Sequence, residues 1–443
     1  MGSFLLFQHF GVPSRIHNRR LTRMPSIPWK NRLRFQESTQ RGLCRFVFFW
    51  LALIPCLAVV CFSAVRVTPW YQTYQRDWWQ QRISDNLGVD VRFASIDFPS
   101  PDAFRAKDLI CTDPENGREI LKVPLVSGEM DRSGWSVKLH SPELNGQQLA
   151  TATQKVHDWF LCRPQKSASL LRLSVPELTI YEGANNTRFQ DIEVGLKPTD
   201  TVSTLIVTFS LENQRVAKPA SFRVDRNHQL DSPATQWSLE TKDLAIPCSL
   251  LSERFPAMHY LGKQSAFKGT MTWAQNDQHW RTTLQGEFQA VDLNMVSRPI
   301  GSPASGFGKL VFEGVDVMDG NLRDVRGTVL SAPGAVIDTS WMTSYVNSGQ
   351  GKAWTDSGRT ASLDRLALRF FMSPEGIRLS GGLKPAQAAA YVDKQAVFCP
   401  DAFVMPPQQI QDWFSGPAIQ DLLVFAGIRV PALETQPSRI AER

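Results

Sequence analysis

The residues that could do chemistry are scattered, with no spacing that assembles a known type of site. Histidines stand at positions 9, 17, 140, 157, 228, 259 and 279, and no pair has the spacing of a helical zinc site. Gly-Lys pairs at Gly262, Gly308 and Gly351 are not followed by Ser or Thr, so no P-loop is present. The Gly-x-Ser-x-Gly motif that carries the nucleophile of many hydrolases is missing too.

Two carboxylates, Asp316 and Asp319, have the residue type that glycoside hydrolysis needs. They flank the hairpin signal Asp319-Gly320, where solvation explains them better. His279 follows Asp277 by two residues in a polar turn, which we interpret the same way. We therefore expect no catalytic, cofactor-binding or metal-binding residues, and a protein that is not an enzyme.

The cysteines are too few for a small disulfide-rich protein. Four of the seven, Cys111, Cys162, Cys248 and Cys399, lie beyond the apolar segment near the N-terminus. In an oxidising compartment they allow two disulfides in three connectivities. The sequence contains no Cys-x-x-Cys, so it predicts neither a redox motif nor a zinc ribbon.

The apolar segment that would fix the compartment is 46–65, which contains no charged residue. At about 1.5 Å per residue a helix of this length spans the roughly 30 Å of a bilayer core, so we predict one transmembrane helix. The preceding residues 1–45 hold nine Lys or Arg and a single acid, Glu37, which predicts a cytoplasmic tail. Two alternatives are a cleaved signal peptide, which usually has a shorter apolar core, and a buried helix of a soluble domain.

The charge of +6 does not indicate nucleic-acid binding, because the basic excess belongs to this tail. Without the tail, 39 basic residues remain against 41 acidic ones. Residues 66–87 follow the membrane segment with Trp70, Tyr71, Tyr74, Trp78 and Trp79. This pattern predicts a juxtamembrane helix, whose aromatic residues lie either at the membrane interface or against the next domain.

Residues 88–400 alternate apolar and polar positions, as half-buried strands do. The pattern occurs at 89–93, 171–175, 205–211, 280–288, 366–372 and 377–383, with turn signals at 114–117, 319–320 and 374–376. We expect a mainly β protein: a single N-terminal transmembrane helix, then an elongated antiparallel β-sheet or groove with a few short helices. The expected helices are 150–162, 246–260 and 385–398, and residues 401–443 are expected to form an amphipathic cap.

Several motifs resemble the AsmA-like bacterial envelope proteins, a family that includes TamB and other repeating β-groove proteins. In that family a membrane helix precedes a Leu-Gly-Val strand, a strand ending in Asp-Pro with a glycine turn, and repeated hairpins. The matching segments cover parts of 45–150 and 265–385, namely Leu87-Gly88-Val89, Phe93 to Asp97, Lys107 to Gly117, Ile120 to Pro124, Phe267 to Trp273, Trp280 to Phe288, Val291 to Leu293 and Gly320 to Gly327.

The resemblance implies a single-pass inner-membrane protein with a periplasmic β-groove that holds phospholipid or acyl chains and serves outer-membrane biogenesis. It supplies no catalytic residues. The alternation equally fits a closed core between two layers, because both arrangements require one apolar face. Our candidates for the groove lining are Leu205, Val207, Phe209, Trp280, Leu284 and Phe288.

Three functions follow from these observations. The first is a non-enzymatic envelope protein that binds or guides lipid. The second is an envelope scaffold that binds partner proteins through exposed strand edges. The third is a lumenal type II membrane enzyme, which the lack of an Asp-x-Asp motif disfavours.

Overall fold

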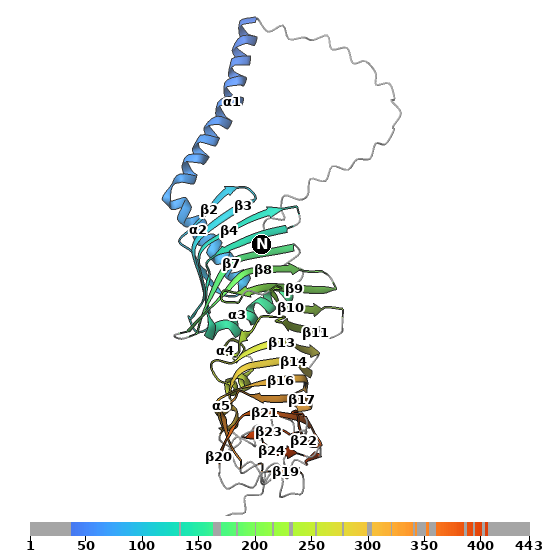
Figure 1. Ribbon diagram of the computed structural model, residues 1–443. Coiled ribbons are helices and arrows are strands. Elements are labelled where there is room, and N and C mark those ends of the chain that lie inside the picture. The colour runs from blue at the N-terminus through green and yellow to red at the C-terminus, as the bar shows by residue number, and fades with distance from the viewer. Residues whose placement is uncertain are drawn as a thin grey trace, which may run out of the picture.

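A computed structural model describes residues 37–405 apart from short gaps. These gaps are residues 133, 163–169, 183–184, 200, 215–216, 230–233, 253–254, 277–278, 299–303, 320, 340–341, 343–350, 354–359, 385–387, 393–394 and 401–403. The described chain is a long, narrow β structure with a projecting helix at one end (Figure 1). It is mainly β, as the sequence predicts.

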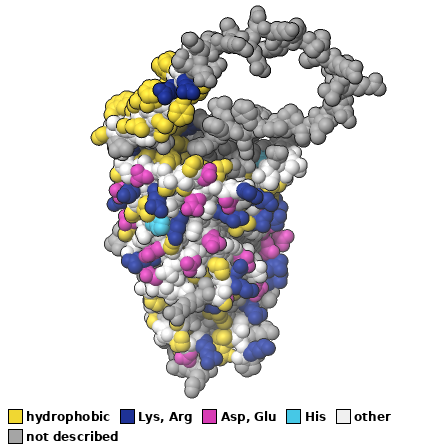
Figure 2. Space-filling view, turned by 90° about the horizontal axis from the view of Figure 1, so that it is seen from above, with side chains coloured by type: hydrophobic (Ala, Val, Ile, Leu, Met, Phe, Trp, Pro, Cys, Tyr) yellow, Lys and Arg dark blue, Asp and Glu magenta, His cyan; other side chains and the backbone are white. Residues whose placement is uncertain are grey.

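Helix α1 (Glu37–Val67) contains the predicted membrane segment. Its stretch Arg41–Val65 is long and apolar enough to span a membrane, and none of it is buried in the protein. Figure 2 shows hydrophobic side chains gathered over this end of the molecule, whereas the remaining visible surface mixes basic and acidic groups. The helix extends the predicted span by nine residues into the basic tail.

Helix α2 (Pro69–Leu87) is the predicted juxtamembrane helix. Pro69 starts it at a position where the missing N–H is not needed. Gly88 ends it in the left-handed region at φ 61°, and its N–H donates to the carbonyl of Ser84 at 2.8 Å. The turn leads directly into the first strand, so α2 is fixed to the start of the sheet.

One 22-stranded sheet makes up most of the remaining structure. Its strands are β1 (Asp90–Arg92), β2 (Ser95–Ser100), β3 (Ala103–Thr112), β4 (Glu119–Asp131), β5 (Gly134–His140), β6 (Glu143–Asn145), β7 (Leu170–Glu182), β8 (Asn185–Lys197), β9 (Val202–Leu211), β10 (Ala220–Asn227), β11 (Ala234–Glu240), β12 (Ile246–Pro247), β13 (Ala266–Asn276), β14 (His279–Asp292), β16 (Phe307–Met318), β17 (Asn321–Ser331), β19 (Gly351–Ala353), β21 (Arg365–Ser373), β22 (Gly376–Gly381), β23 (Ala390–Val392), β24 (Gln395–Pro400) and β25 (Val404–Met405). A second, three-stranded sheet contains β15 (Ala304–Ser305), β18 (Ala335–Asp338) and β20 (Thr360–Leu363).

The strands pair largely in chain order and antiparallel, as expected of successive hairpins. The long strands lie in the order β3, β4, β5, β7, β8, β9, β10, β11, β13, β14, β16, β17, β21 and β22. The exception is β7, which runs parallel to β5 and β6. The described part of the crossover between them contains η2 (Gly146–Gln148), α3 (Leu149–Val156) and the π-helical turn η3 (His157–Leu161).

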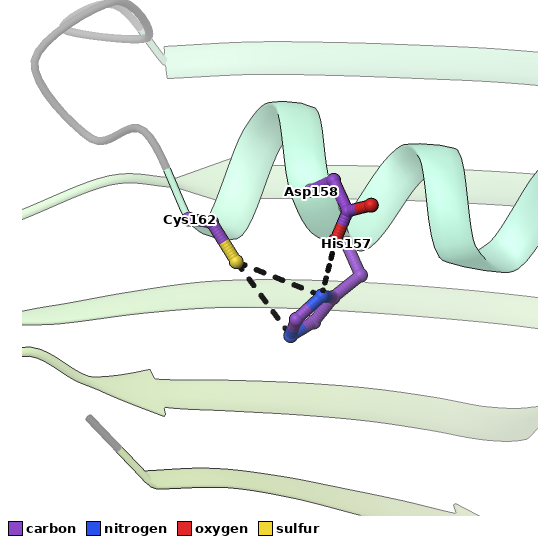
Figure 3. A group of neighbouring side chains, drawn as sticks. All are labelled: His157, Asp158 and Cys162. Carbon is purple, nitrogen blue, oxygen red and sulfur yellow. Dashed lines mark hydrogen bonds and ion pairs between the residues drawn. The ribbon is translucent and has the colours of Figure 1, made fainter. Parts of the chain in front are cut away.

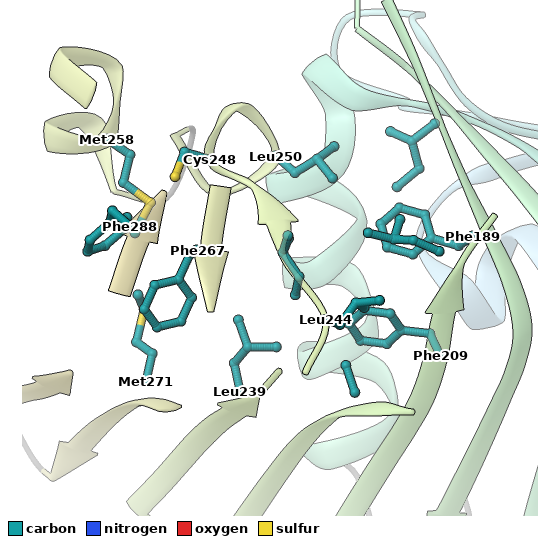
Figure 4. Packing of buried hydrophobic residues seen from close by; sticks show 14 of the residues in the cluster. Phe189, Phe209, Leu239, Leu244, Cys248, Leu250, Met258, Phe267, Met271 and Phe288 are labelled. Atoms are coloured by element: carbon teal, nitrogen blue, oxygen red, sulfur yellow. The ribbon is translucent and has the colours of Figure 1, made fainter. Parts of the chain in front are cut away.

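Short helices cover one face of the sheet, here called the inner face and defined by Leu205, Phe209, Val224, Phe267 and Phe288. Besides α3 and η3 they are α4 (Cys248–Ser252), η5 (Pro256–Leu261) and α5 (Leu293–Ser297). Figure 4 shows side chains of α4 and η5 packed over the aromatic residues of the strands. The inner face is therefore the hydrophobic core.

Two helix predictions need correction. Residues 385–398, where they are described, form β23 and β24, and Ala388, Ala389 and Ala390 are fully buried. Burial of these small side chains against the core outweighs the helix propensity of alanine. The predicted helix 246–260 is broken into β12, α4 and η5, because Pro247 and Pro256 cannot donate a helical hydrogen bond.

The other predicted elements fare differently. The predicted helix at 150–162 is confirmed, with a π turn at its end. Most of the predicted C-terminal cap lies outside the described residues, and Val404–Met405 adds a strand beside β22.

Candidate functional site

A continuous row of apolar residues crosses the inner face of the sheet from strand to strand. Each member lies directly opposite the next in the strand register, so the side chains are within contact distance. The members, from β3 to β22, are Phe104, Gly128, Val137, Leu173, Val194, Val207, Phe222, Leu239, Met271, Leu284, Val315, Val325, Met372 and Ile377. We call this set the apolar row. Thirteen steps of about 4.8 Å make it about 60 Å long.

The burial of the apolar row varies along its length. Leu239, Met271 and Val325 are buried, whereas Val207 and Leu284 are half-buried. Gly128 lacks a side chain, and the ring of Phe104 occupies the space where its Cβ would be. The apolar surface thus continues across the glycine.

A second row runs beside the first and contains tryptophans. It passes from Leu205 through Val224 to Trp237, which lies opposite Trp273. The rings of Trp237 and Trp273 are stacked with centroids 6.0 Å apart, and those of Trp237 and Trp280 with centroids 5.5 Å apart. Such stacks add about 0.5–1.5 kcal/mol beyond burial and provide a flat apolar surface.

All six groove candidates lie on this inner face. Leu205, Phe209 and Phe288 are buried at 7%, 9% and 4% exposure, and they pack against other parts of the chain. Val207, Trp280 and Leu284 are half-buried. All six pack against the core clusters, and Val207, Trp280 and Leu284 differ only in keeping part of their side chains exposed.

The outer face carries charged side chains that pair with one another. Arg281 donates two hydrogen bonds to Asp316, at 2.9 and 3.0 Å, and Arg326 contacts Asp324 at 2.8 Å. Asp319 accepts from the backbone N–H of Trp280 at 2.7 Å and lies 2.8 Å from the His279 imidazole. Asp316 and Asp319 are thus engaged in separate interactions and do not form the facing pair that glycoside hydrolysis needs.

The end of the sheet that lies next to α1 is closed by α2. Trp79, Ile83 and Leu87 pack on the apolar cluster around Val91 and Val123. Trp70 and Tyr74, one turn apart, have stacked rings and are 73% and 60% exposed. One side of α2 therefore packs on the domain, and Trp70 and Tyr74 are exposed on the other; the position of these rings at a membrane interface stays a prediction.

Of the four cysteines beyond α1, Cys111 and Cys248 are thiols in the structure and form no disulfide there. Burial raises the pKa of Cys111 to about 12 and that of Cys248 to about 11. These two thiols are thereby kept protonated and unreactive.

One polar cluster was missed by the sequence analysis. His157, Asp158 and Cys162 have ligand-type atoms that all lie within 4.8 Å of one another (Figure 3). A search for helical zinc spacing overlooks them because residues five apart lie on different sides of an α-helix. The two residues come together only because of a π turn, and the sequence contains no pattern that predicts this turn.

Comparison with protein-family models, with curated proteins and with solved structures finds no match. The resemblance to the AsmA-like family therefore stays a prediction based on its motifs.

Proposed function

We propose that this chain is a non-enzymatic, membrane-anchored envelope protein whose β-sheet binds or guides lipid along its inner face. The apolar row carries the proposal. It is uninterrupted over fourteen strands and runs from the end of the sheet fixed to α2 toward the far end (Figure 1). A surface with this one-dimensional continuity suits an acyl chain, which gains about 0.8 kcal/mol for each methylene it buries.

The anchor supports the same proposal. Helix α1 has the length and composition of a membrane span, and α2 joins it to the sheet with exposed Trp70 and Tyr74 in between. In the arrangement that we propose, residues 1–45 are cytoplasmic, the span lies in a bacterial inner membrane and the sheet is periplasmic. Lipid leaving the bilayer would then meet the sheet at its β2–β4 end.

The proposal makes the half-buried part of the apolar row the contact surface. Val207 and Leu284 belong to it, with the stacked tryptophans beside them. Buried members such as Met271 support this surface from within the core. This division lets one sheet both fold around α3, α4 and η5 and keep an apolar strip for a ligand.

The experiment compares Val207→Asp with Ile206→Asp. Val207 is on the inner face, and its neighbour Ile206 is 39% exposed on the outer face. The full chain is purified in mild detergent and its co-purifying lipid is quantified by mass spectrometry, with circular dichroism to verify the fold. We expect wild type and Ile206→Asp to retain phospholipid and Val207→Asp to lose most of it. Equal lipid in both folded variants, or lipid-free wild type that crosslinks only to a partner protein, would contradict the proposal.

A further inference from the structure

The π turn η3 brings two metal-binding residue types to the same side of a helix. In an α-helix, residues five apart differ by about 140° in direction, at 100° per residue. Here the N–H of Cys162 donates to the carbonyl of His157 at 3.1 Å, which is the wider i to i+5 turn. This turn places Cys162 back over His157, and such turns occur frequently at functional sites.

The separations between the ligand atoms suit a tetrahedral zinc ion. With Zn–S of about 2.3 Å and Zn–N and Zn–O of about 2.0–2.1 Å, tetrahedral ligands lie about 3.3–3.6 Å apart. Sγ of Cys162 is 3.6 Å from Nδ1 of His157, and Nδ1 is 3.1 Å from Oδ1 of Asp158. Sγ also lies 3.9 Å from Nε2, so the Cys162 side chain must turn toward the lone pair of Nδ1 for the three atoms to share an ion.

Charge and access also suit a divalent cation. A Cys162 thiolate and the Asp158 carboxylate would together balance two positive charges, and binding would release the thiol proton. The side chain of His157 is 17% exposed and that of Asp158 is 46% exposed, so the ion has a path from solvent. A water molecule could take the fourth position from the exposed side, as in sites with three protein ligands.

The remaining nitrogen of His157 has the partner that a metal-bound histidine needs. Nε2 lies 3.3 Å from Oγ1 of Thr235, a residue on β11 that is 1% exposed. Nη1 of Arg226 donates to the same oxygen at 2.7 Å, and Trp237 packs beside the imidazole with centroids 5.7 Å apart. With Nδ1 on the metal, Nε2–H would donate to Thr235, the outer contact that fixes a ligand's ring orientation.

We propose that His157, Asp158 and Cys162 form a binding site for a zinc-type divalent transition-metal ion. The ion fixes the π turn against the inner face, where Leu161 packs on Leu205 and Val224. The crossover before β7 is thus fastened to the middle of the sheet. The site is independent of lipid binding, so either proposal can fail without the other.

Equilibrium dialysis of the metal-free, reduced full chain against Zn²⁺ tests the site, with metal measured by mass spectrometry. We expect one zinc per chain. Loss of a residue that hydrogen-bonds to a metal ligand typically weakens metal binding ~10–100-fold, and we expect this for Thr235→Val. Cys162→Ser and His157→Ala remove proposed ligands and should each weaken zinc binding by more than that. Cys111→Ser is the matched control, because it removes a thiol from β3 and should leave binding unchanged. Co²⁺ should give the visible spectrum of a tetrahedral thiolate complex, which Cys162→Ser abolishes.

A second measurement needs no variant and so does not depend on whether a variant folds. Zn²⁺ should slow alkylation of Cys162 in the wild-type chain at least tenfold, without changing the rate at Cys111. The proposal is overturned if wild type binds no stoichiometric zinc, if Cys162→Ser binds as tightly as wild type, or if zinc leaves the alkylation of Cys162 unchanged.

Discussion

A close backbone approach lies between β13 and β14, where Gly269 and Gly286 stand directly opposite each other. Both have positive φ, at 156° and 147°. A Cβ on Gly286 would lie 2.3 Å from the carbonyl oxygen of Lys268 and 2.6 Å from Cα of Gly269. These are backbone atoms, so Gly286→Ala can be relieved only by moving the two strands about 1 Å apart.

The cost of Gly286→Ala has two parts. Holding alanine in a backbone conformation that favours glycine costs about 1–3 kcal/mol. The steric conflict adds about 1–3 kcal/mol, as overpacking does in cores. The total of about 2–6 kcal/mol is a large part of the 5–15 kcal/mol that stabilises typical proteins. Because β13 and β14 also carry Met271 and Leu284, their separation would interrupt the apolar row.

Urea denaturation of the full chain in detergent measures this cost through tryptophan fluorescence, since Trp273 and Trp280 lie on the two strands concerned. Gly314→Ala is the matched control on neighbouring β16, where a Cβ meets no atom within 4 Å. We expect the free energy of unfolding of Gly314→Ala to stay within about 0.5 kcal/mol of wild type, and that of Gly286→Ala to fall sharply, with a lower urea midpoint. Coincident midpoints for the two variants would refute the strand geometry argued here.

Two further predictions concern titration and reactivity. The backbone N–H of Trp280 and the side chain of His279 lower the pKa of Asp319 below its usual 3.8. The contact should therefore persist above that value and be lost only as the pH falls through the lower pKa of the folded state; carboxyl NMR should show this, and Asp319→Asn should remove the signal. With pKa values raised from 9.0 to about 12 and about 11, Cys111 and Cys248 should react with iodoacetamide at pH 8 about 100-fold or more slowly in the folded chain than in urea. Equal rates in the two conditions would show that these thiols are not buried.

The sequence predicted those parts of the fold that follow from local periodicity. The alternation at 205–211 and 280–288 correctly gave β9 and β14 and the shared face of Leu205 and Phe288. The apolar run 46–65 correctly gave a helix. These predictions succeed because successive residues of a strand point to opposite faces of the sheet, so alternate residues share a face.

The remaining features depend on contacts between distant residues. Residues 388–390 have a helical composition, yet they form a bridge, a bend and a strand end and are fully buried, two of them in the cluster that contains Phe398. The alternation of apolar and polar residues predicts neither the parallel crossover to β7 nor the layer of short helices on the inner face. The cluster of His157 and Cys162 needs a π turn, which no local sequence rule predicts.

The most direct test of lipid binding uses a photoreactive amino acid on either face of three strands. Inner positions Val207, Leu284 and Met372 belong to the apolar row, and Ile206, Gln285 and Phe371 are their outer neighbours. After irradiation in bacterial membranes, our account predicts phospholipid adducts at the three inner positions and none at the outer ones. Adducts that do not depend on which face carries the probe, or protein adducts alone, would contradict it.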